Sequence, residues 1–409
     1  MKNVKIIKET IWSFLTKGLT LILLFAINII LARKLGKETY GEWTFLFSII
    51  TIIALVSFMG INLSAKKFIA QYNGTKKVYA IIKSSLKLRI LISLTFSVII
   101  IIFHNSLAKL FLVPQYSQYI LLASILVFFM GLVEYFKEVF TGLHDIKYNF
   151  MINITEYGFK IIFLILFFSW SVSIYEVIES YILASIISAI CGLAVIWKLI
   201  SKEKKNHYNE IWKYGLPLFL ISIGFAISTE ISTIMLGLLK NSGEVGIFAV
   251  AKQIIYYLPQ ISQAIIIGTM PIFAKLNEEN KRELKAFFIK VLKINTWIFI
   301  PVTLFLIISS KFFIPLLFGV QYGEAWKVTM YLIPYMLIAS YSAYFGAVLD
   351  YVGLAKKRAI NLMVAILLSI LLNFLLIPPL GAIGAAIATS CAPLPYFILN
   401  WIEVKKVLF

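Results

Sequence analysis

Long apolar runs alternate with short charged segments along the whole chain. A helix needs about 20 apolar residues to cross the hydrocarbon core of a bilayer. The runs lack the strict apolar–polar alternation of membrane β-strands, so helices are expected. The pattern predicts an all-α membrane protein with twelve spans, at 10–33, 41–64, 86–103, 118–138, 149–169, 175–198, 214–239, 245–275, 288–310, 326–349, 357–378 and 380–401.

A charged stretch from Ser201 to Lys213 divides these spans into two sets of six. We therefore expect an N-terminal six-helix bundle at 1–198, a cytoplasmic linker at 199–213 and a C-terminal six-helix bundle at 214–409. The halves also resemble each other: at a shift of 205 residues, Tyr40-Gly41 falls on Val245-Gly246. Six crossings are an even number, so two copies would have the same orientation in the membrane, with a cleft between them.

The amino-acid composition also indicates a membrane protein and excludes several kinds of functional site. The chain is 61% hydrophobic and 14% charged, with a mean hydropathy of +0.92, so the bilayer must be its solvent. Two cysteines and three scattered histidines predict neither a metal site nor a disulfide framework. Nucleotide-binding and nucleophile motifs are missing from the sequence, and the outer loops are short. We expect no cofactor, no catalytic residues and no enzyme activity.

The formal charge of +19 raises the question of a nucleic-acid partner. The positive charges are instead distributed over the short segments between spans, which is typical of orientation in a membrane. With a cytoplasmic N-terminus, 28 Lys and Arg residues lie on the cytoplasmic side and 7 on the opposite side. The count predicts a multi-pass protein of the cell (inner) membrane with both termini in the cytoplasm, and no nucleic-acid binding.

Three segments resemble one known family. Leu31 to Gly41 is similar to the "LAR.LG...YG" signature of polysaccharide transporters, and Leu317 to Ala325 is similar to their "LFG..Y..A" motif. Asn373 to Thr389 resembles their "N..LIP..G..GAA.AT" ending. These motifs follow one another in the family's order over nearly the whole chain, so the protein resembles Wzx-type polysaccharide flippases of the multidrug/oligosaccharidyl-lipid/polysaccharide (MOP) exporter superfamily.

The resemblance implies a V-shaped, MATE-like pair of six-helix bundles around a central cationic cavity. It also implies translocation of a polyprenyl-(di)phosphate-linked oligosaccharide by alternating access, with Na⁺ or H⁺ as candidate coupling ions. The cavity residues of the family vary, so the candidate residues of this chain come from its own sequence. The sugar, the carrier, the coupling ion and the oligomeric state stay open.

Ionisable residues inside apolar spans are costly and therefore mark candidate sites. Lys17, in the first span, can line the cavity or extend toward the cytoplasmic interface. Lys160, in the fifth span, has Glu156 one turn earlier. The two form either a neutral pair within the helix or a substrate-binding lysine with an ion-coupling carboxylate. Glu134 and Glu138, at the end of the fourth span, are expected to face cytoplasmic water.

The eighth span carries a polar stripe that begins at Lys252. Lysine suits phosphate, and phenol and amide groups suit sugar hydroxyls, so a substrate-binding face is predicted; Pro259 is expected to bend the helix. Glu230, in the seventh span, either pairs with Lys252 or couples an ion. The other substrate-binding candidates on the stripe are Tyr256, Gln260 and Gln263.

Two other classes of protein are compatible with parts of this pattern. An ion-coupled multidrug exporter of the same superfamily would carry an acidic site in an early helix, whereas the first span carries Lys17. A membrane enzyme that acts on glycolipids would need a large outer loop with catalytic side chains. A flippase accounts best for lysines inside the bilayer.

Overall fold

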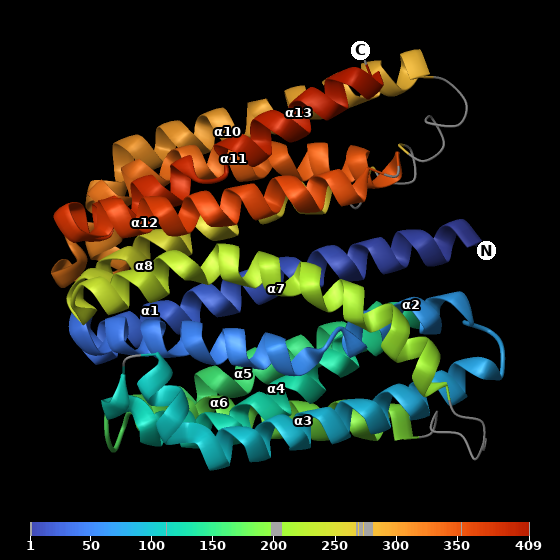
Figure 1. The fold of residues 1–409 in the computed structure, drawn as a ribbon, viewed down its shortest axis with the longest axis horizontal. Helices are drawn as coiled ribbons and strands as arrows, with labels where there is room; N and C mark the ends of the chain where they lie inside the picture. The colour runs from blue at the N-terminus through green and yellow to red at the C-terminus, as the bar shows by residue number, and fades with distance from the viewer. Residues whose placement is uncertain are drawn as a thin grey trace. The chain divides into compact units, whose positions relative to one another are not determined.

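The computed structural model describes residues 2–111, 113–197, 207–266, 269, 273, 281–352 and 354–408. These residues form helices and contain no β-strand, so the all-α fold class is confirmed (Figure 1). The α-helices are α1 (Lys2–Phe58), α2 (Ile61–Gln71), α3 (Lys77–Leu110), α4 (Ser117–Gly142), α5 (Ile146–Phe167), α6 (Ile174–Ile196), α7 (Tyr208–Leu239), α8 (Ser242–Tyr257), α10 (Lys281–Phe318), α11 (Ala325–Tyr351), α12 (Ala355–Cys391) and α13 (Leu394–Leu408). Two short 3₁₀ turns, η1 (Pro114–Tyr116) and η3 (Val320–Tyr322), precede α4 and α11.

Within the described residues, nine helical stretches are long and apolar enough to cross a membrane. Two of them, Ile11–Phe58 and Lys356–Leu408, are 48 and 53 residues long and each covers two predicted spans. Both contain a glycine with positive φ, Gly36 at 79° and Gly381 at 56°, where the helix axis changes direction. The predicted total of twelve spans stays a prediction, because parts of span 245–275 lie outside the described residues.

The chain divides into two compact units. Unit 1 comprises Met1–Asn28 and Leu46–Ala226, and unit 2 comprises Ile29–Phe45 and Ile227–Phe409. The middle of α1 therefore packs with the second half of the chain. Most of the predicted linker, residues 199–206, lies outside the described residues, and the predicted bundle limits stay a prediction.

Unit 1 is built around α4, which packs against α3, α5 and α6 (Figure 1). Its core contains fully buried apolar side chains from α2, α3 and α4, among them Ile69, Ile81 and Tyr135. At one corner, Met59 and Gly60 both have positive φ and separate α1 from α2. A Cβ on Gly60 would lie 2.0 Å from the carbonyl oxygen of Gly215 in α7, so glycine permits this close approach.

Unit 2 contains α8, α10, α11, α12 and α13, in which α11 packs against the other four (Figure 1). Side chains on one face of α10 remain exposed although they are large and apolar: Leu304, Ile308 and Phe312 are 53%, 73% and 75% exposed. In water such a face would be unfavourable. In a membrane it contacts lipid, in agreement with the composition.

The three segments that carry the family resemblance make contacts within unit 2, where the first two bond to each other and the third bonds to α8. Tyr322 donates a hydrogen bond to the carbonyl oxygen of Ala32 at 3.0 Å, and Arg33 Nε donates to the carbonyl oxygen of Leu317 at 2.7 Å. From the third segment, the amide of Ala382 donates to Glu244 Oε2 at 2.7 Å, directly after the kink at Gly381. The motifs thus cap helix ends and join helices.

Candidate functional site

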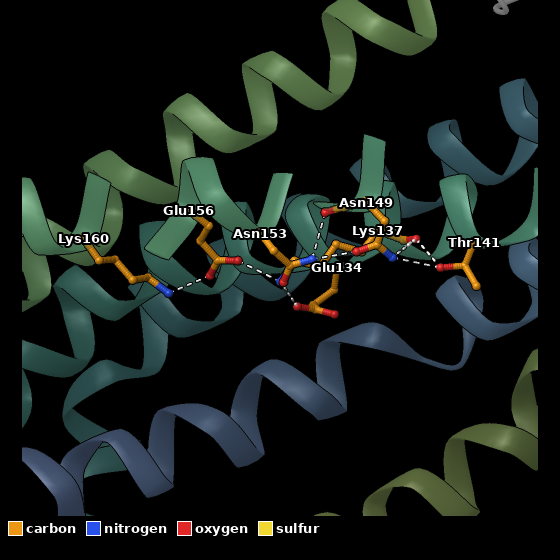
Figure 2. Close-up of polar contacts among 7 residues, drawn as sticks. All are labelled: Glu134, Lys137, Thr141, Asn149, Asn153, Glu156 and Lys160. Carbon is orange, nitrogen blue, oxygen red and sulfur yellow. Dashed lines mark hydrogen bonds and ion pairs between the residues drawn. The ribbon is translucent and has the colours of Figure 1, made fainter. Parts of the chain in front are cut away.

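Unit 1 contains a buried row of charged side chains on α4 and α5 (Figure 2). Glu156 forms ion pairs with two lysines: its Oε1 accepts a hydrogen bond from Lys160 Nζ at 2.6 Å, and its Oε2 lies 2.7 Å from Lys137 Nζ. Lys137 Nζ also lies 2.7 Å from Glu134 Oε1. The side chains of Lys137, Glu156 and Lys160 are 9%, 7% and 6% exposed, whereas Glu134 is 41% exposed. The row therefore runs from a partly accessible carboxylate into the interior of the unit.

Neutral polar groups hold this row in place. Asn149 Nδ2 donates to the carbonyl oxygen of Lys137 at 3.0 Å and to Thr141 Oγ1 at 2.9 Å, which joins α5 to α4 (Figure 2). Lys160 Nζ lies 4.8 Å and 4.6 Å from the ring centres of Tyr157 and Tyr181. Aromatic faces stabilise a buried ammonium group at such distances. The two lysines and two glutamates of the row balance in charge, which favours the burial of Lys137, Glu156 and Lys160.

Glu156 and Lys160 are paired within the helix, which is one of the two alternatives that the sequence left open. The structure corrects the expectation for the end of α4, which continues to Gly142. Glu138 is 23% exposed and pairs with Lys66 at 3.0 Å, so it does not simply face water. Sequence reasoning also missed Lys137 as a buried partner. The burial of Lys137 could have been predicted from the sequence, because the apolar pattern of the fourth span continues beyond Lys137 for about another turn.

Arg89 is a second buried cation of unit 1 that the sequence did not single out. On sequence it counts with the charges of the first cytoplasmic loop, but in α3 it is 0% exposed. Its Nη1 donates to the carbonyl oxygen of Ser57 at 3.0 Å, and its Nε donates to Ser93 Oγ at 2.8 Å. Ser57 lies in the last turn of α1, where a positive charge is favourable for the helix dipole.

Unit 2 contains the predicted pair of Lys252 and Glu230. Lys252 Nζ lies 2.8 Å from Glu230 Oε2 and 3.1 Å from Thr233 Oγ1, with side-chain exposures of 15% and 20% for the two charged residues. This ion pair across the α7–α8 hairpin is one of the two roles that the sequence left open for Glu230. Tyr256 packs its ring 5.2 Å from Lys252 Nζ and stacks on Tyr335 of α11 at 4.5 Å, a partner that lies too far away in sequence to be predicted.

The predicted polar stripe is interrupted. Helix α8 ends at Tyr257, and the chain becomes helical again at Gln260, so the bend expected at Pro259 is confirmed. Gln260 is half-buried and Gln263 is exposed. Lys252 and Tyr256 thus lie before the bend, and the two glutamines lie after it. The four side chains do not belong to one continuous helix face.

Lys17 lies in α1 within unit 1 and is half-buried. Among the described residues it makes no ion pair, in contrast with Lys160 and Lys252. The same part of the chain contains no cluster of three or more His, Cys, Asp or Glu side chains with the geometry of a metal site. The candidate chemistry is therefore that of ammonium, carboxylate, phenol and amide groups.

The comparisons place the chain in a family. Residues 6–277 match the model of the family described as polysaccharide biosynthesis protein, so the chain belongs to this family and the suspected resemblance is confirmed. A lipopolysaccharide biosynthesis protein, WzxC of Escherichia coli (strain K12), is 26% identical over 205 residues. That match covers 48% of this chain and 40% of the relative.

Two solved structures have the same fold. The lipid II flippase MurJ in an inward closed conformation gives a TM-score of 0.77 at 18% identity, with 98% of this chain and 87% of that chain covered. An inward-facing multidrug resistance MATE family transporter of the MOP superfamily gives 0.76 at 16% identity, with 95% of each chain covered. The fold is thus that of MOP transporters. These relatives are transporters and flippases, in agreement with the prediction that the chain is not an enzyme.

Proposed function

We propose that this protein is a flippase that moves polyprenyl-(di)phosphate-linked oligosaccharide from the cytoplasmic to the outer leaflet of the cell membrane for surface polysaccharide biosynthesis. The observation that carries the proposal is a lysine paired with a glutamate inside the membrane-spanning helices of each unit. Membership of the polysaccharide biosynthesis family supports the substrate class. Both termini would lie in the cytoplasm, as the distribution of Lys and Arg indicates.

The lysine–glutamate pairs provide a mechanism for binding and release. A diphosphate can replace a carboxylate as the partner of an ammonium group, and each charge-assisted contact is worth about 1.5–3 kcal/mol. The displaced carboxylate of Glu156 or Glu230 then favours uptake of H⁺ or Na⁺, because an unpaired charge in the membrane is costly. Substrate binding and ion binding are coupled in this way, and alternating access requires that the two conformations differ in which partner they favour.

The remaining candidates have roles that follow from their chemistry. Lys17 lacks an ion-pair partner among the described residues, so in this proposal it provides a permanent positive charge for the diphosphate. Tyr256, Gln260 and Gln263 contact sugar hydroxyls through phenol and amide groups. Tyr335 orients the Tyr256 ring by stacking.

An ion-coupled multidrug exporter is the alternative, and the MATE-like fold supports it. Cationic drugs would require acidic groups that stay ionised and unpaired in the site. Glu156 and Glu230, in contrast, are each paired with a lysine. Increased resistance to cationic drugs on expression, without an effect on surface polysaccharide, would favour the exporter.

Complementation of a strain that lacks the gene tests the flippase. Lys252→Ala and Lys160→Ala should each abolish surface polysaccharide while the protein remains in the membrane, and Lys→Arg at the same positions should retain part of the activity. Lys240→Ala is the matched control, because Lys240 is exposed and lies outside the site. Where Lys160→Ala lowers the amount of protein, the double variant Lys160→Met, Glu156→Gln removes the unpaired charge and keeps the test valid. Normal polysaccharide in all Ala variants at normal protein levels would contradict the proposal.

A further inference from the structure

A cavity of about 200 Å³ lies between the N-terminal end of α12 and the C-terminal end of α13, in unit 2 and apart from the candidate site. It has a charged rim and an apolar wall. The rim carries Lys357, Lys406, Glu403 and Asn361, and the wall is formed by Ile360, Leu399 and Ile402.

The rim of the cavity has a net positive charge, because its one carboxylate pairs with two lysines. Glu403 is shared, with Oε2 at 3.0 Å from Lys357 Nζ and Oε1 at 3.1 Å from Lys406 Nζ. The lysines are 54% and 65% exposed, whereas Glu403 is only 18% exposed. An ammonium group has three donors. Each lysine therefore retains donors for a second acceptor, and the net charge of the three groups is positive.

The wall continues into the surface that faces the hydrocarbon. Ile360 and Ile402 are 53% and 41% exposed, and farther along α12 Met363 and Leu367 are 64% and 69% exposed. A molecule at this place thus meets two ammonium groups at one end and a continuous apolar helix face at the other. That arrangement matches a lipid with an anionic headgroup, and basic pockets between helices at the cytoplasmic leaflet are typical of such binding.

We propose that this cavity binds an anionic phospholipid of the bilayer, with its phosphate between Lys357 and Lys406 and an acyl chain along the exposed face of α12. The first turn of α12 adds to the site, because Leu354 at its N-cap provides no side-chain hydrogen bond and the helix N-terminus carries partial positive charge. The shared Glu403 competes with the phosphate for both lysines.

Binding of defined lipids to the purified full chain tests this proposal. Native mass spectrometry in detergent should show that wild-type protein retains phosphatidylglycerol at least about fivefold better than phosphatidylcholine, which has no net charge. In the Lys357→Ala, Lys406→Ala variant this preference should disappear. The matched control is Lys356→Ala, Lys405→Ala, which removes the same charge from neighbouring exposed lysines outside the cavity and should keep the preference.

Glu403→Gln separates binding from a structural role. If the rim binds phosphate, Glu403→Gln releases both lysines and should strengthen phosphatidylglycerol binding severalfold, opposite to the lysine variants. Equal loss in the cavity and control variants would overturn the proposal, and so would weaker binding in Glu403→Gln. Tighter retention of a polyprenyl phosphate than of phosphatidylglycerol would overturn it as well, since the cavity would then be a site for the substrate carrier.

Discussion

At the residue scale, the charged side chains in the row on α4 and α5 are arranged so that each has an opposite partner. Glu156 is shared between Lys137 of α4 and Lys160 of its own helix, and Lys137 is shared in turn with Glu134. Removal of one partner from such a buried set leaves an uncompensated charge, which costs about 3–5 kcal/mol. The cost is much smaller at the accessible end of the row, where water screens the charge.

We therefore expect Glu156→Gln to lower the free energy of unfolding by about 3 kcal/mol or more, because Lys160 loses its carboxylate partner. Glu134→Gln should cost less than about 1 kcal/mol, since Glu134 is 41% exposed. Lys160→Met in the Glu156→Gln background should restore most of the loss. Thermal unfolding of the purified variants in detergent measures all three. Equal effects of Glu156→Gln and Glu134→Gln would show that the row is not a buried network.

Arg89 stabilises the corner between α1 and α2 by donating to Ser57 at the end of α1. Gly131 of α4 leaves room for it, because a Cβ there would lie 2.4 Å from Arg89 Nη2. Arg89→Ala should lower the thermal midpoint by several degrees, whereas Lys87→Ala, an exposed change in the same helix, should have little effect. Gly131→Ala should be as harmful as Arg89→Ala in the wild type but nearly neutral in the Arg89→Ala background. Additive losses would contradict the contact.

At the scale of elements, two glycines related by the 205-residue shift make a reciprocal contact within unit 2. A Cβ on Gly41 would lie 1.7 Å from the carbonyl oxygen of Ser242, and a Cβ on Gly246 would lie 2.2 Å from the carbonyl oxygen of Lys37. Ser242 is itself the counterpart of Lys37 at that shift. The two copies thus place equivalent turns against each other, which agrees with duplication of a six-helix ancestor.

This contact predicts matched effects of substitution. Gly41→Ala and Gly246→Ala should each reduce the amount of folded protein strongly and to a similar degree, because the new methyl group meets backbone that cannot move aside. Gly158→Ala is the control: a Cβ there meets nothing within 4 Å, and alanine favours the helix. The fraction of monodisperse protein after detergent extraction is the readout. Tolerance of alanine at both positions would refute the close approach.

At the scale of the whole molecule, the family motifs explain architecture more than chemistry. Arg33, Tyr322 and Ala382 take part in hydrogen bonds that join α1, α8, α10 and α12 in unit 2. The lysines and glutamates of the candidate site lie outside these motifs. In this chain the residues of the family motifs and the residues of the candidate site are therefore separate sets.

The predicted orientation of the chain in the membrane can be tested with reporter fusions. A reporter enzyme fused after Ser201 should report the cytoplasm, and one fused after Ser242 should report the outside, because the sequence pattern assigns 28 Lys and Arg residues to the cytoplasmic side and 7 to the opposite side. A fusion after the C-terminal Phe409 serves as a second cytoplasmic control. The reverse pattern would place both termini outside the cytoplasm and would contradict the predicted orientation.

The fold class and the membrane environment could be predicted from the sequence, which also offered the pairs Glu156–Lys160 and Glu230–Lys252, each as one of two alternatives. These follow from local rules: apolar runs of fixed length need a bilayer, and charges one helical turn apart, or across a short hairpin, meet. The bend at Pro259 is predictable for the same reason, because proline lacks the donor that a continuous helix needs.

The distant residues that complete the site could not be predicted from the sequence, because packing between helices brings them together. Lys137 joins Glu156 and Tyr335 stacks on Tyr256 because α4 packs on α5 and α11 packs on α8. The assignment of residues 29–45 to unit 2 could not be predicted either. The periodicity of α1 does not indicate which half of the chain this part of the helix contacts. Periodicity reports the face of a helix that is buried, but the partner that buries it is set by packing between segments far apart in the chain.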